Sequence, residues 1–455
     1  MDRIIESIGR FQSGLDYQDL PADVVHAAKR VLVDTMGCAL GGYNTPTAAA
    51  ARQIAQAVQP TEKSRSASIL VNGAATSPDL AAFANGVMLR VLDFNDSFHG
   101  RGNGGHPSDA IAGVLAVAES DHADGKSLLS AIVSAYEVFC RYVGLTKLGA
   151  DPWDHVTATV LGVAGASSRL MGLTPEQLQN ALTLAIVPNM TLRATRFEEL
   201  SMWKACAAAN ASRNGVFAAI LASHDMTGPP RPFEGRGGAF AGPVPQFEPP
   251  ALGENGFAIQ ECQFKRFPVC SLTQTAATAA LELYDAGVPA DQIERVHVGT
   301  TQFAIHVTAG DREKWRPVTR ETADHSLPLV VAATMRDGAA GATDILEANA
   351  FTDPDLLALM DRIEVSPDPD CDAAAPATTA KLRVTLTSGE TRSATVKYHR
   401  GHYMNPMTDD ELGDKFLAQT EAVIGAQAAK NLLDLMWDID RSADVGEMIA
   451  ATRRS

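Results

Sequence analysis

The chain has 455 residues and a formal net charge of −16 at pH 7, and both values limit what it can be. Hydrophobic cores stop growing near roughly 250–300 residues, so we expect two domains. The acidic surplus disfavours nucleic acid and anionic lipid as partners, because their binding depends on clustered lysine and arginine. Hydrophobic residues make up 45% of the chain, charged residues make up 20%, and no run of about 20 apolar residues occurs. This composition is typical of a soluble globular protein and argues against a membrane-spanning one.

The N-terminal residues and the cysteines indicate the cellular compartment. The segment MDRIIESIGRF carries charges early and has neither a long apolar stretch nor a small-residue cleavage site, so we expect a cytoplasmic protein without a secretory signal. The spacing of the cysteines fits neither a zinc site nor an iron–sulfur site. We interpret them as reduced thiols. They are Cys38, Cys140, Cys206, Cys262, Cys270 and Cys371.

The first 250 residues are patterned almost entirely as helix. Residues 22–40 place apolar side chains at helical spacing, and Gly41-Gly42 is expected to end that helix with a left-handed cap. Residues 108–118 are apolar on nearly every side, which is typical of a helix buried inside a bundle. Capping residues predict one further helix that begins at Ser77-Pro78 and another that begins at Thr174-Pro175. Helical spacing predicts a third at residues 199–222.

A segment dense in glycine and proline, residues 227–256, interrupts this pattern and indicates a linker or a surface excursion. After it, helices and strands alternate. The pattern predicts helices at 273–286, 320–336 and 353–361, strands at 295–300 and 362–365, and a hairpin of 381–387 with 392–398. From Asp409 onward the chain is helical again. We therefore predict a mostly α protein with an all-helical domain of residues 1–262 and 405–455 and an α/β domain of residues 263–404.

The segment DFNDSFHGRGNGGHPSD, residues 93–109, has the composition of an active-site loop. Its glycines allow the backbone to approach a ligand. His106 immediately precedes the buried helix, whose N-terminal N–H groups favour an anion such as a carboxylate. The alternative is that the acids only cap helices and the histidines are solvated. No spacing in the segment matches a standard metal site. Its ionisable residues are Asp93, Asp96, His99, Arg101, His106 and Asp109.

Three further positions carry ionisable groups that suit a site. Lys204 lies in a helix of small and apolar residues, so it faces a ligand or a carboxylate unless its side chain extends to the surface. Lys265-Arg266 suits anion capture and equally suits a solvated turn. His155 opens another helix and is either functional or structural. The glycine-rich segment EGRGGAF lacks the strand and the lysine of a phosphate-binding loop.

At these segments the sequence resembles the MmgE/PrpD family. The resemblance implies a large all-helical domain, a smaller α/β lid, a homodimer, and catalysis without metal or organic cofactor on small di- or tricarboxylates. The family includes 2-methylcitrate dehydratase, cis-aconitate decarboxylase and iminodisuccinate epimerase. The segments that carry the resemblance are LDFNDSFHGRGNGGHPSD (92–109), MTGPPRPFEGRGGAF (226–240), FKRFPVCSLTQTA (264–276), WRPVTRETADHSLP (315–328) and YHRGHYMNPMTDDEL (398–412).

The resemblance also suggests which residues form the site. One difference from the family lies after the lysine of FKRFP, where relatives often carry a histidine and this chain has Val269, Cys270, Ser271 and Leu272. The family's site falls on Asp93, Ser97, His106, His155, Lys204 and Lys265, of which only Ser97 was not already indicated by its chemistry. We therefore expect catalytic roles for Asp93, His106, His155, Lys204 and Lys265 and substrate contacts from Ser97, Asp96 and Arg101.

The expected reaction removes a proton next to a carboxylate and expels water, because the loop at 93–109 resembles that of the dehydratases. Lys204 and Lys265, with His155, would hold the carboxylates and stabilise the developing charge. Asp93, alone or through His106, would be the base, and His106 or a water would protonate the leaving hydroxyl. We also expect the two lysines to lie on different domains. Decarboxylation and epimerisation are the alternatives within this class, and a non-catalytic carboxylate-binding protein is the alternative outside it.

Overall fold

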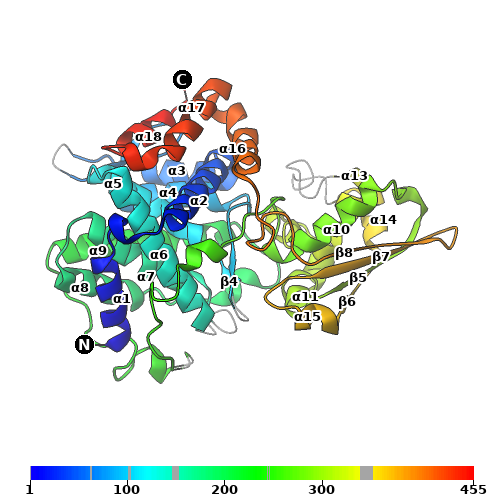
Figure 1. The fold of residues 1–455 in the computed structure, drawn as a ribbon, viewed down its shortest axis with the longest axis horizontal. Coiled ribbons are helices and arrows are strands. Elements are labelled where there is room, and N and C mark those ends of the chain that lie inside the picture. The colour runs from blue at the N-terminus through cyan, green and yellow to red at the C-terminus, as the bar shows by residue number, and fades with distance from the viewer. Residues whose placement is uncertain are drawn as a thin grey trace. The chain divides into compact units, whose positions relative to one another are not determined.

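The computed structural model describes residues 2–61, 64–100, 104–145, 153–242, 244, 246–338 and 352–454. Its contacts divide the chain into two compact units. Unit 1 consists of residues 1–193, 205–262 and 408–455, and unit 2 consists of residues 194–204 and 263–407. The described chain is mostly helical, and its four-stranded sheet belongs to unit 2 (Figure 1).

Unit 1 is a bundle of helices with two very short antiparallel strand pairs. The strands are β1 (Ala67–Ser68) with β2 (Ala75–Thr76), and β3 (Phe98–His99) with β4 (Gly104–Gly105). The helices are α1 (Arg3–Gly14), α2 (Ala22–Gly41), α3 (Pro46–Gln56), α4 (Pro78–Arg90), α5 (Ile111–Ser120), α6 (Gly125–Leu145), α7 (Val156–Leu170), α8 (Pro175–Ile186), α9 (Trp203–Ser223), α16 (Asp409–Ile424), α17 (Ala426–Trp437) and α18 (Gly446–Ala451). The first residues of α9 group with unit 2.

Helix α2 confirms the predicted helix at 22–40, but its end differs from the prediction. Gly42 follows the helix with φ −74°, a right-handed conformation, so the expected left-handed cap is wrong. A Cβ atom at Gly42 would lie 2.0 Å from the carbonyl oxygen of Met88. Glycine is needed here because α2 and α4 approach closely, and not because of its backbone angle.

Helix α5 confirms the buried helix predicted at 108–118. Residues 111–118 are all buried, and α4, α6 and α7 contact the helix. It begins later than expected, because residues Pro107–Ala110 form a 3₁₀ turn first. Helix α8 starts with the expected capping box of Thr174 and Gln177.

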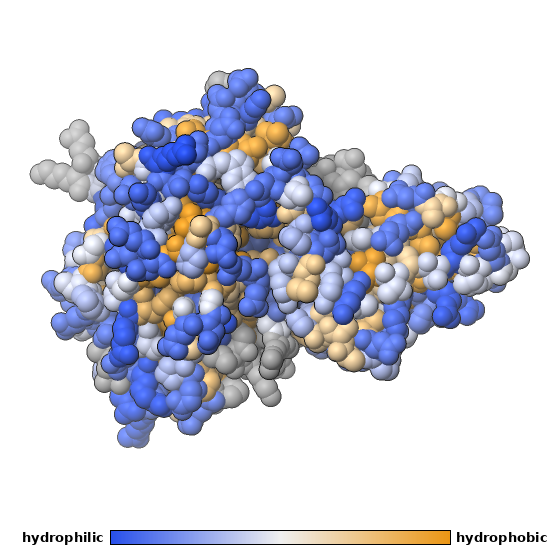
Figure 2. Space-filling view, viewed as in Figure 1, coloured by the Kyte–Doolittle hydropathy of each residue, from blue (hydrophilic) through white to orange (hydrophobic). Residues whose placement is uncertain are grey.

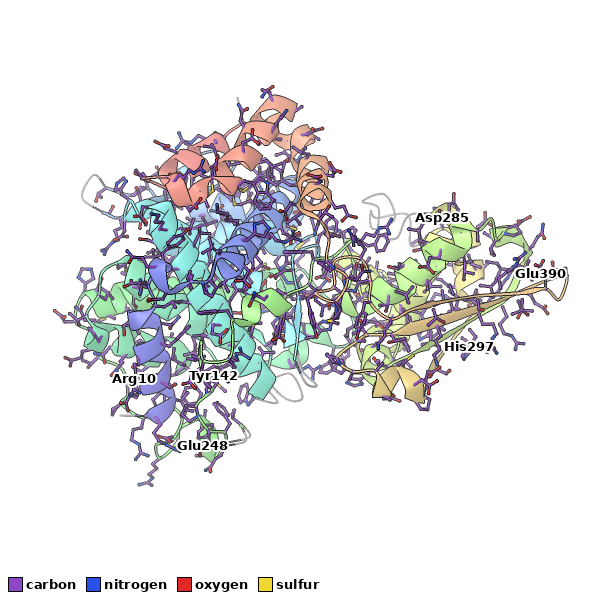
Figure 3. All side chains as sticks on the ribbon, in the orientation of Figure 1. Arg10, Tyr142, Glu248, Asp285, His297 and Glu390 are labelled. Atoms are coloured by element: carbon purple, nitrogen blue, oxygen red, sulfur yellow. The ribbon has the colours of Figure 1, made fainter. Side chains whose placement is uncertain are left out.

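The described residues of 227–256 form no α-helix or strand, as expected, but they pack onto unit 1. The ring of Tyr142 on α6, labelled in Figure 3, lies with its centroid 6.4 Å from that of Phe233 and 5.6 Å from that of Phe247. The carboxylate of Asp2 accepts hydrogen bonds from the backbone N–H groups of Phe233 and Glu234, both at 2.8 Å. The segment is therefore an anchored surface excursion.

Unit 2 is built on a mixed sheet with the strand order β6-β5-β7-β8. Strand β5 (Ile293–Thr300) pairs parallel with β6 (Ile363–Pro367) and antiparallel with β7 (Ala380–Leu386). Strand β8 (Thr391–Val396) completes the predicted hairpin with β7, and Gly389 in its turn has φ +83°. The helices of the unit are α10 (Gln274–Asp285), α11 (Gln302–Thr308), α12 (Arg320–Ala323), α13 (Leu327–Asp337), α14 (Pro354–Met360) and α15 (Pro369–Ala373).

Helices α10, α13 and α14 lie along one side of this sheet (Figure 1). Leu283 of α10 and Val331 of α13 join Val296 of β5 and Val384 of β7 in one apolar core. Because side chains alternate along a strand, His297 points to the other face, where its Nε2 lies 2.8 Å from Ser366 Oγ on β6 (Figure 3). The core thus fixes the register that β5 shares with both neighbours.

The surface is mostly hydrophilic on the face in Figure 2, and the six described cysteines form no disulfide. Hydrophilic residues cover most of the face shown in Figure 2, with smaller hydrophobic patches. Among the described residues, no helix has the combination of length and apolar character that a bilayer crossing requires. All six cysteines lie in the described part of the chain, and none of them forms a disulfide.

Candidate active site

The loop between α4 and α5 brings together most of the site residues expected in unit 1. It contains Asp93, Asp96, Ser97 and His106, and the ring of His155 packs beside it. The short β3–β4 pair folds the loop back on itself, so that Phe98 pairs with Gly105. Arg101, the third expected substrate contact, lies outside the described residues.

Arg90, in the last turn of α4, is a cation at the base of this loop. Its Nη1 forms a buried ion pair with Oδ1 of Asp93, and its Nε lies 3.7 Å from Oδ1 of Asp109. Asp93 is 1% exposed and has φ +50°, a left-handed conformation that is strained for a residue with a side chain. The ion pair helps to hold Asp93 in that conformation. Sequence analysis missed Arg90, although the i,i+3 spacing from Asp93 was the available signal.

His106 is held by one ring nitrogen in a way that defines its tautomer. Its Nδ1 lies 2.6 Å from the backbone carbonyl oxygen of Asp96. A carbonyl oxygen only accepts hydrogen bonds, so Nδ1 carries the hydrogen and Nε2 is the basic nitrogen of the neutral ring. Nε2 lies 4.0 Å from Oδ1 of Asp93. This ring can therefore accept a proton at Nε2 beside a carboxylate that stabilises the resulting charge.

His155 repeats this arrangement at the N-terminus of α7. Its Nδ1 lies 3.1 Å from Oδ1 of Asp154, and its Nε2 lies 3.9 Å from Oδ2 of Asp109. The centroids of the His155 and His106 rings are 5.6 Å apart. Gly105 makes this packing possible, because a Cβ atom there would lie 2.6 Å from Cδ2 of His155. Two neighbouring imidazoles, each beside a carboxylate, are suited to take a proton at one ring and donate one from the other.

Asp96, an expected substrate contact, has a hydrogen-bond partner at each of its carboxylate oxygens. Its Oδ1 accepts a hydrogen bond from the backbone N–H of Ser108 at 3.1 Å, and its Oδ2 accepts one from the Tyr136 hydroxyl at 2.9 Å. Burial raises the pKa of Asp96 to about 6, although the hydrogen bonds from Ser108 and Tyr136 lower it and Asp34 raises it further. The anion at the start of the helix is therefore Asp96 itself, and we assign it a positioning role.

We expect Asp96→Asn to make the protein more stable than wild type near neutral pH. The pKa of this carboxyl group is raised from 3.8 to about 6 by folding, so its stabilising contribution is present below about pH 4 and is lost as the pH rises through 6. The loss amounts to about 3 kcal/mol for such a shift. An asparagine amide stays neutral and can still accept from Ser108 and donate to Tyr136.

The measurement is urea unfolding of Asp96→Asn and wild type at about pH 4.5 and about pH 7.5. The difference in unfolding free energy between the two proteins should shift in favour of the variant at the higher pH. If this difference in unfolding free energy were the same at both pH values, ionisation of the buried Asp96 carboxyl group would carry no cost in stability.

Two other groups in unit 1 complete the surroundings of the loop. The hydroxyl of Ser97 is buried and makes no hydrogen bond with any described residue, which suits the expected substrate contact. Lys415 on α16 donates to Oδ1 of Asp34 at 2.6 Å and to the carbonyl oxygen of Phe94 at 2.9 Å. Sequence analysis gave Lys415 no role, although the preceding segment YHRGHYMNPMTDDEL was one of those that carried the resemblance.

Lys204 and Lys265 both belong to unit 2 and are both buried. The Nζ atom of Lys204 donates to both carboxylate oxygens of Asp324, at 2.6 and 2.7 Å. Lys204 is 3% exposed, so the alternative in which it reaches the surface is wrong. Arg266 is exposed, whereas Lys265 is not, so a solvated turn describes only the arginine. The sequence placed the two lysines on different domains, whereas the contacts group both of them with unit 2.

Asp324 and His325 are the residues of unit 2 that sequence analysis left without a role. Nδ1 of His325 lies 2.5 Å from Oδ1 of Asp324, and the backbone N–H of Cys270 donates to the Asp324 carbonyl oxygen at 2.9 Å. Cys270 belongs to the segment 269–272, where the family resemblance would place a histidine. The backbone of that segment is therefore hydrogen-bonded to Asp324, the residue next to His325. The available signal was the segment WRPVTRETADHSLP, which contains both residues.

The fold is mostly helical with a small α/β part. Its loop at 93–109 places histidines beside carboxylates, an arrangement typical of enzymes that transfer protons. The MmgE/PrpD N-terminal domain model matches residues 6–250, and the MmgE/PrpD C-terminal domain model matches residues 267–440. The chain therefore belongs to the MmgE/PrpD family.

Several curated relatives match the chain over most of its length. A cis-aconitate decarboxylase-like protein of Aspergillus oryzae is 27% identical over 95% of this chain and 93% of its own length. Cis-aconitate decarboxylase of Homo sapiens is 26% identical over 97% of this chain and 92% of its own. For 2-methylcitrate dehydratase of Escherichia coli the identity is 28%, over 74% of this chain and 72% of the relative. These relatives are dehydratase and decarboxylase enzymes, and the chain is an enzyme of the same family.

Proposed function

We propose that this protein is a hydro-lyase that acts on a small di- or tricarboxylate, in the manner of a 2-methylcitrate dehydratase. The pair of His106 and His155 is the observation that carries the proposal. Each ring has its Nδ1 beside an oxygen acceptor and its Nε2 within about 4 Å of a carboxylate. Removal of a proton and departure of a hydroxyl group require one base and one acid, and two such rings can supply both.

In the proposed reaction, Nε2 of His106 takes the proton from the carbon next to a substrate carboxylate. Asp93 then stabilises the imidazolium that forms. The carbon–oxygen bond breaks as Nε2 of His155, in its protonated form, gives a proton to the leaving hydroxyl, which departs as water. We prefer His106 to Asp93 as the base because the carboxylate of Asp93 is already engaged in a buried ion pair with Arg90.

Lys204 and Lys265 are proposed to supply positive charge for the substrate carboxylates. A carbanion next to a carboxylate develops additional negative charge, and fixed cations lower the energy of such a transition state. The burial of both lysines supports this role, since an ammonium group acts more strongly away from water. No metal ion or organic cofactor is included in the proposal.

Decarboxylation is the second candidate function. It is favoured by the cis-aconitate decarboxylase-like protein and the human cis-aconitate decarboxylase, which match 95% and 97% of this chain. A protonated imidazole could deliver a proton to the carbon that loses carbon dioxide. Epimerisation remains the alternative that requires the same two rings to remove and return a proton.

A substrate panel tests the proposed function. Purified protein is incubated with 2-methylcitrate, citrate, cis-aconitate and iminodisuccinate, while enoate absorbance and carbon dioxide release are followed, with and without EDTA. We expect enoate formation from a hydroxy-tricarboxylate without carbon dioxide, and the same rate in EDTA. Carbon dioxide release from cis-aconitate would favour the second candidate. No turnover of any compound would contradict the whole class, and a loss in EDTA restored by one metal would contradict cofactor independence.

We further propose that the protein works in the cytoplasm. We also propose that it is a homodimer, as the family resemblance implies. Light scattering at several concentrations measures the mass directly. A mass of one chain at every concentration would contradict the dimer.

A further inference from the structure

Lys314 is a buried lysine to which the proposed reaction gives no role. It lies in the 3₁₀ turn Arg312–Trp315 of unit 2 and is 0% exposed. Its Nζ makes no hydrogen bond with any residue in the described part of the chain. Removing an ammonium group from water without a partner is among the most expensive arrangements in a protein. Such a group therefore indicates a missing ligand.

The backbone around Lys314 is held firmly. Its N–H donates to the carbonyl oxygen of Asp311 at 3.1 Å, and its own carbonyl oxygen accepts a hydrogen bond from the Ser326 hydroxyl. The same hydroxyl caps α13 by accepting from the N–H of Leu329 at 3.1 Å. The indole N–H of Trp315 donates to the carbonyl oxygen of Ala309 at 2.9 Å. These bonds fix the position of Lys314 and oppose its movement to the surface.

Burial and the neighbouring charges both act on the amine of Lys314. Burial lowers the pKa of its ammonium group, and the positive charge of Lys204 lowers it further. The acidic groups Asp324 and Asp311, and the thiol of Cys270 if ionised, act in the opposite direction. Asp324 already receives two hydrogen bonds from Lys204, at 2.6 and 2.7 Å. Lys314 thus has charged groups of both signs around it, while its own Nζ makes no hydrogen bond with any described residue and is the amine left to meet a further carboxylate.

We propose that Lys314, together with Lys204, forms a subsite for one carboxylate of the bound substrate. The inference rests on the proposed function for the chemical class of the ligand, but it concerns a residue that the proposed reaction does not use. The bound carboxylate accepts a hydrogen bond from Lys314 Nζ and removes the cost of its isolation. Binding also favours the charged amine, so the protein takes up a proton when the ligand binds at a pH where part of Lys314 is neutral.

Calorimetric titration with tricarballylate, an unreactive tricarboxylate, tests the subsite. Wild type, Lys314→Met and Lys397→Met are titrated in two buffers with different ionisation enthalpies, from about pH 7 to about pH 9.5. Lys397 is an exposed lysine of unit 2 that lies over the ring of Tyr398, so its loss is a matched removal of one charge. Thermal unfolding of each unliganded protein is measured alongside.

We expect wild type and Lys397→Met to bind tricarballylate with a proton uptake that grows with pH. Lys314→Met should bind about 10- to 150-fold more weakly, without that uptake, because one charge-assisted hydrogen bond is lost. Its unliganded Tm should equal or exceed that of wild type, because a methionine has no charge to bury. A merely structural lysine would instead lower the Tm and leave the proton uptake unchanged.

Three outcomes would overturn the subsite. Equal affinity and equal proton uptake in wild type and Lys314→Met would show that the amine does not meet the ligand. Unchanged binding combined with lost turnover would make Lys314 a proton-transfer residue instead. If inorganic phosphate bound as tightly as tricarballylate, Lys314 would hold anions in general and not specifically a carboxylate. The substrate panel is read out separately, so these outcomes leave the proposed reaction standing, whereas a panel without turnover contradicts that reaction whatever Lys314 does.

Discussion

His106→Ala is expected to lower kcat by at least about 100-fold, because the variant removes the nitrogen that we assign as the base. The fold should persist. The hydrogen bond from Nδ1 to the carbonyl oxygen of Asp96, which the substitution removes, is worth about 1 kcal/mol. Initial rates on the substrate that the panel identifies, together with urea unfolding, measure both effects.

His106→Asn separates the chemical role of this ring from its structural one. The asparagine amide can still donate to the carbonyl oxygen of Asp96, but it cannot transfer a proton at the position of Nε2. We expect it to be as inactive as His106→Ala and closer to wild type in stability. An asparagine variant that regains most of the activity would show that His106 only positions the loop.

The second large effect is expected at Lys204, where Lys204→Met should lower the free energy of unfolding by about 3–5 kcal/mol. The variant leaves the carboxylate of Asp324 buried without the ammonium that donates to both of its oxygens. The lost stability comes from the Asp324 carboxylate that remains buried without its partner. The double variant Lys204→Met/Asp324→Asn should therefore recover most of the lost free energy of unfolding. Urea unfolding of the two single variants and the double variant gives the coupling free energy directly.

A control for Lys204 is available in the same unit. Lys381 pairs with Asp368 and Asp370 near the surface, and its side chain is 35% exposed. Lys381→Met should cost less than about 1 kcal/mol, because water screens such a pair. If Lys204→Met costs no more than Lys381→Met, the Lys204–Asp324 pair carries no burial penalty and the interpretation of unit 2 is wrong.

Lys204 also illustrates how a sequence argument can identify a residue and still misplace it. A lone lysine among alanines indicated a buried group with a partner, because burial of an unpaired ammonium is costly. The partner, Asp324, is 120 positions away in the sequence. No periodicity within the helix could identify it, and so the grouping of Lys204 with unit 2 was not predictable.

In the loop at 93–109, too, the sequence identified candidate residues but not their partners. Its composition identified Asp93, His106 and Asp96, because these residue types rarely gather between apolar helices without a function. Which of them remains available for chemistry depends on hydrogen bonds from elsewhere. Asp96 received the role of substrate contact from the sequence, but the Tyr136 hydroxyl, on α6, and the Ser108 N–H occupy its oxygens.

The sequence by itself determined several helices, such as those at 22–40 and 108–118, and the hairpin of unit 2, because hydrophobic periodicity and capping residues act over a few neighbours. It also determined the family, because several motifs match in order along the chain. Only the tertiary structure decided the partners of the charged groups, such as Arg90 with Asp93 and Asp109, and the tautomers of His106 and His155. Electrostatic energy depends on distance and burial in space, and residues far apart in the sequence fix both.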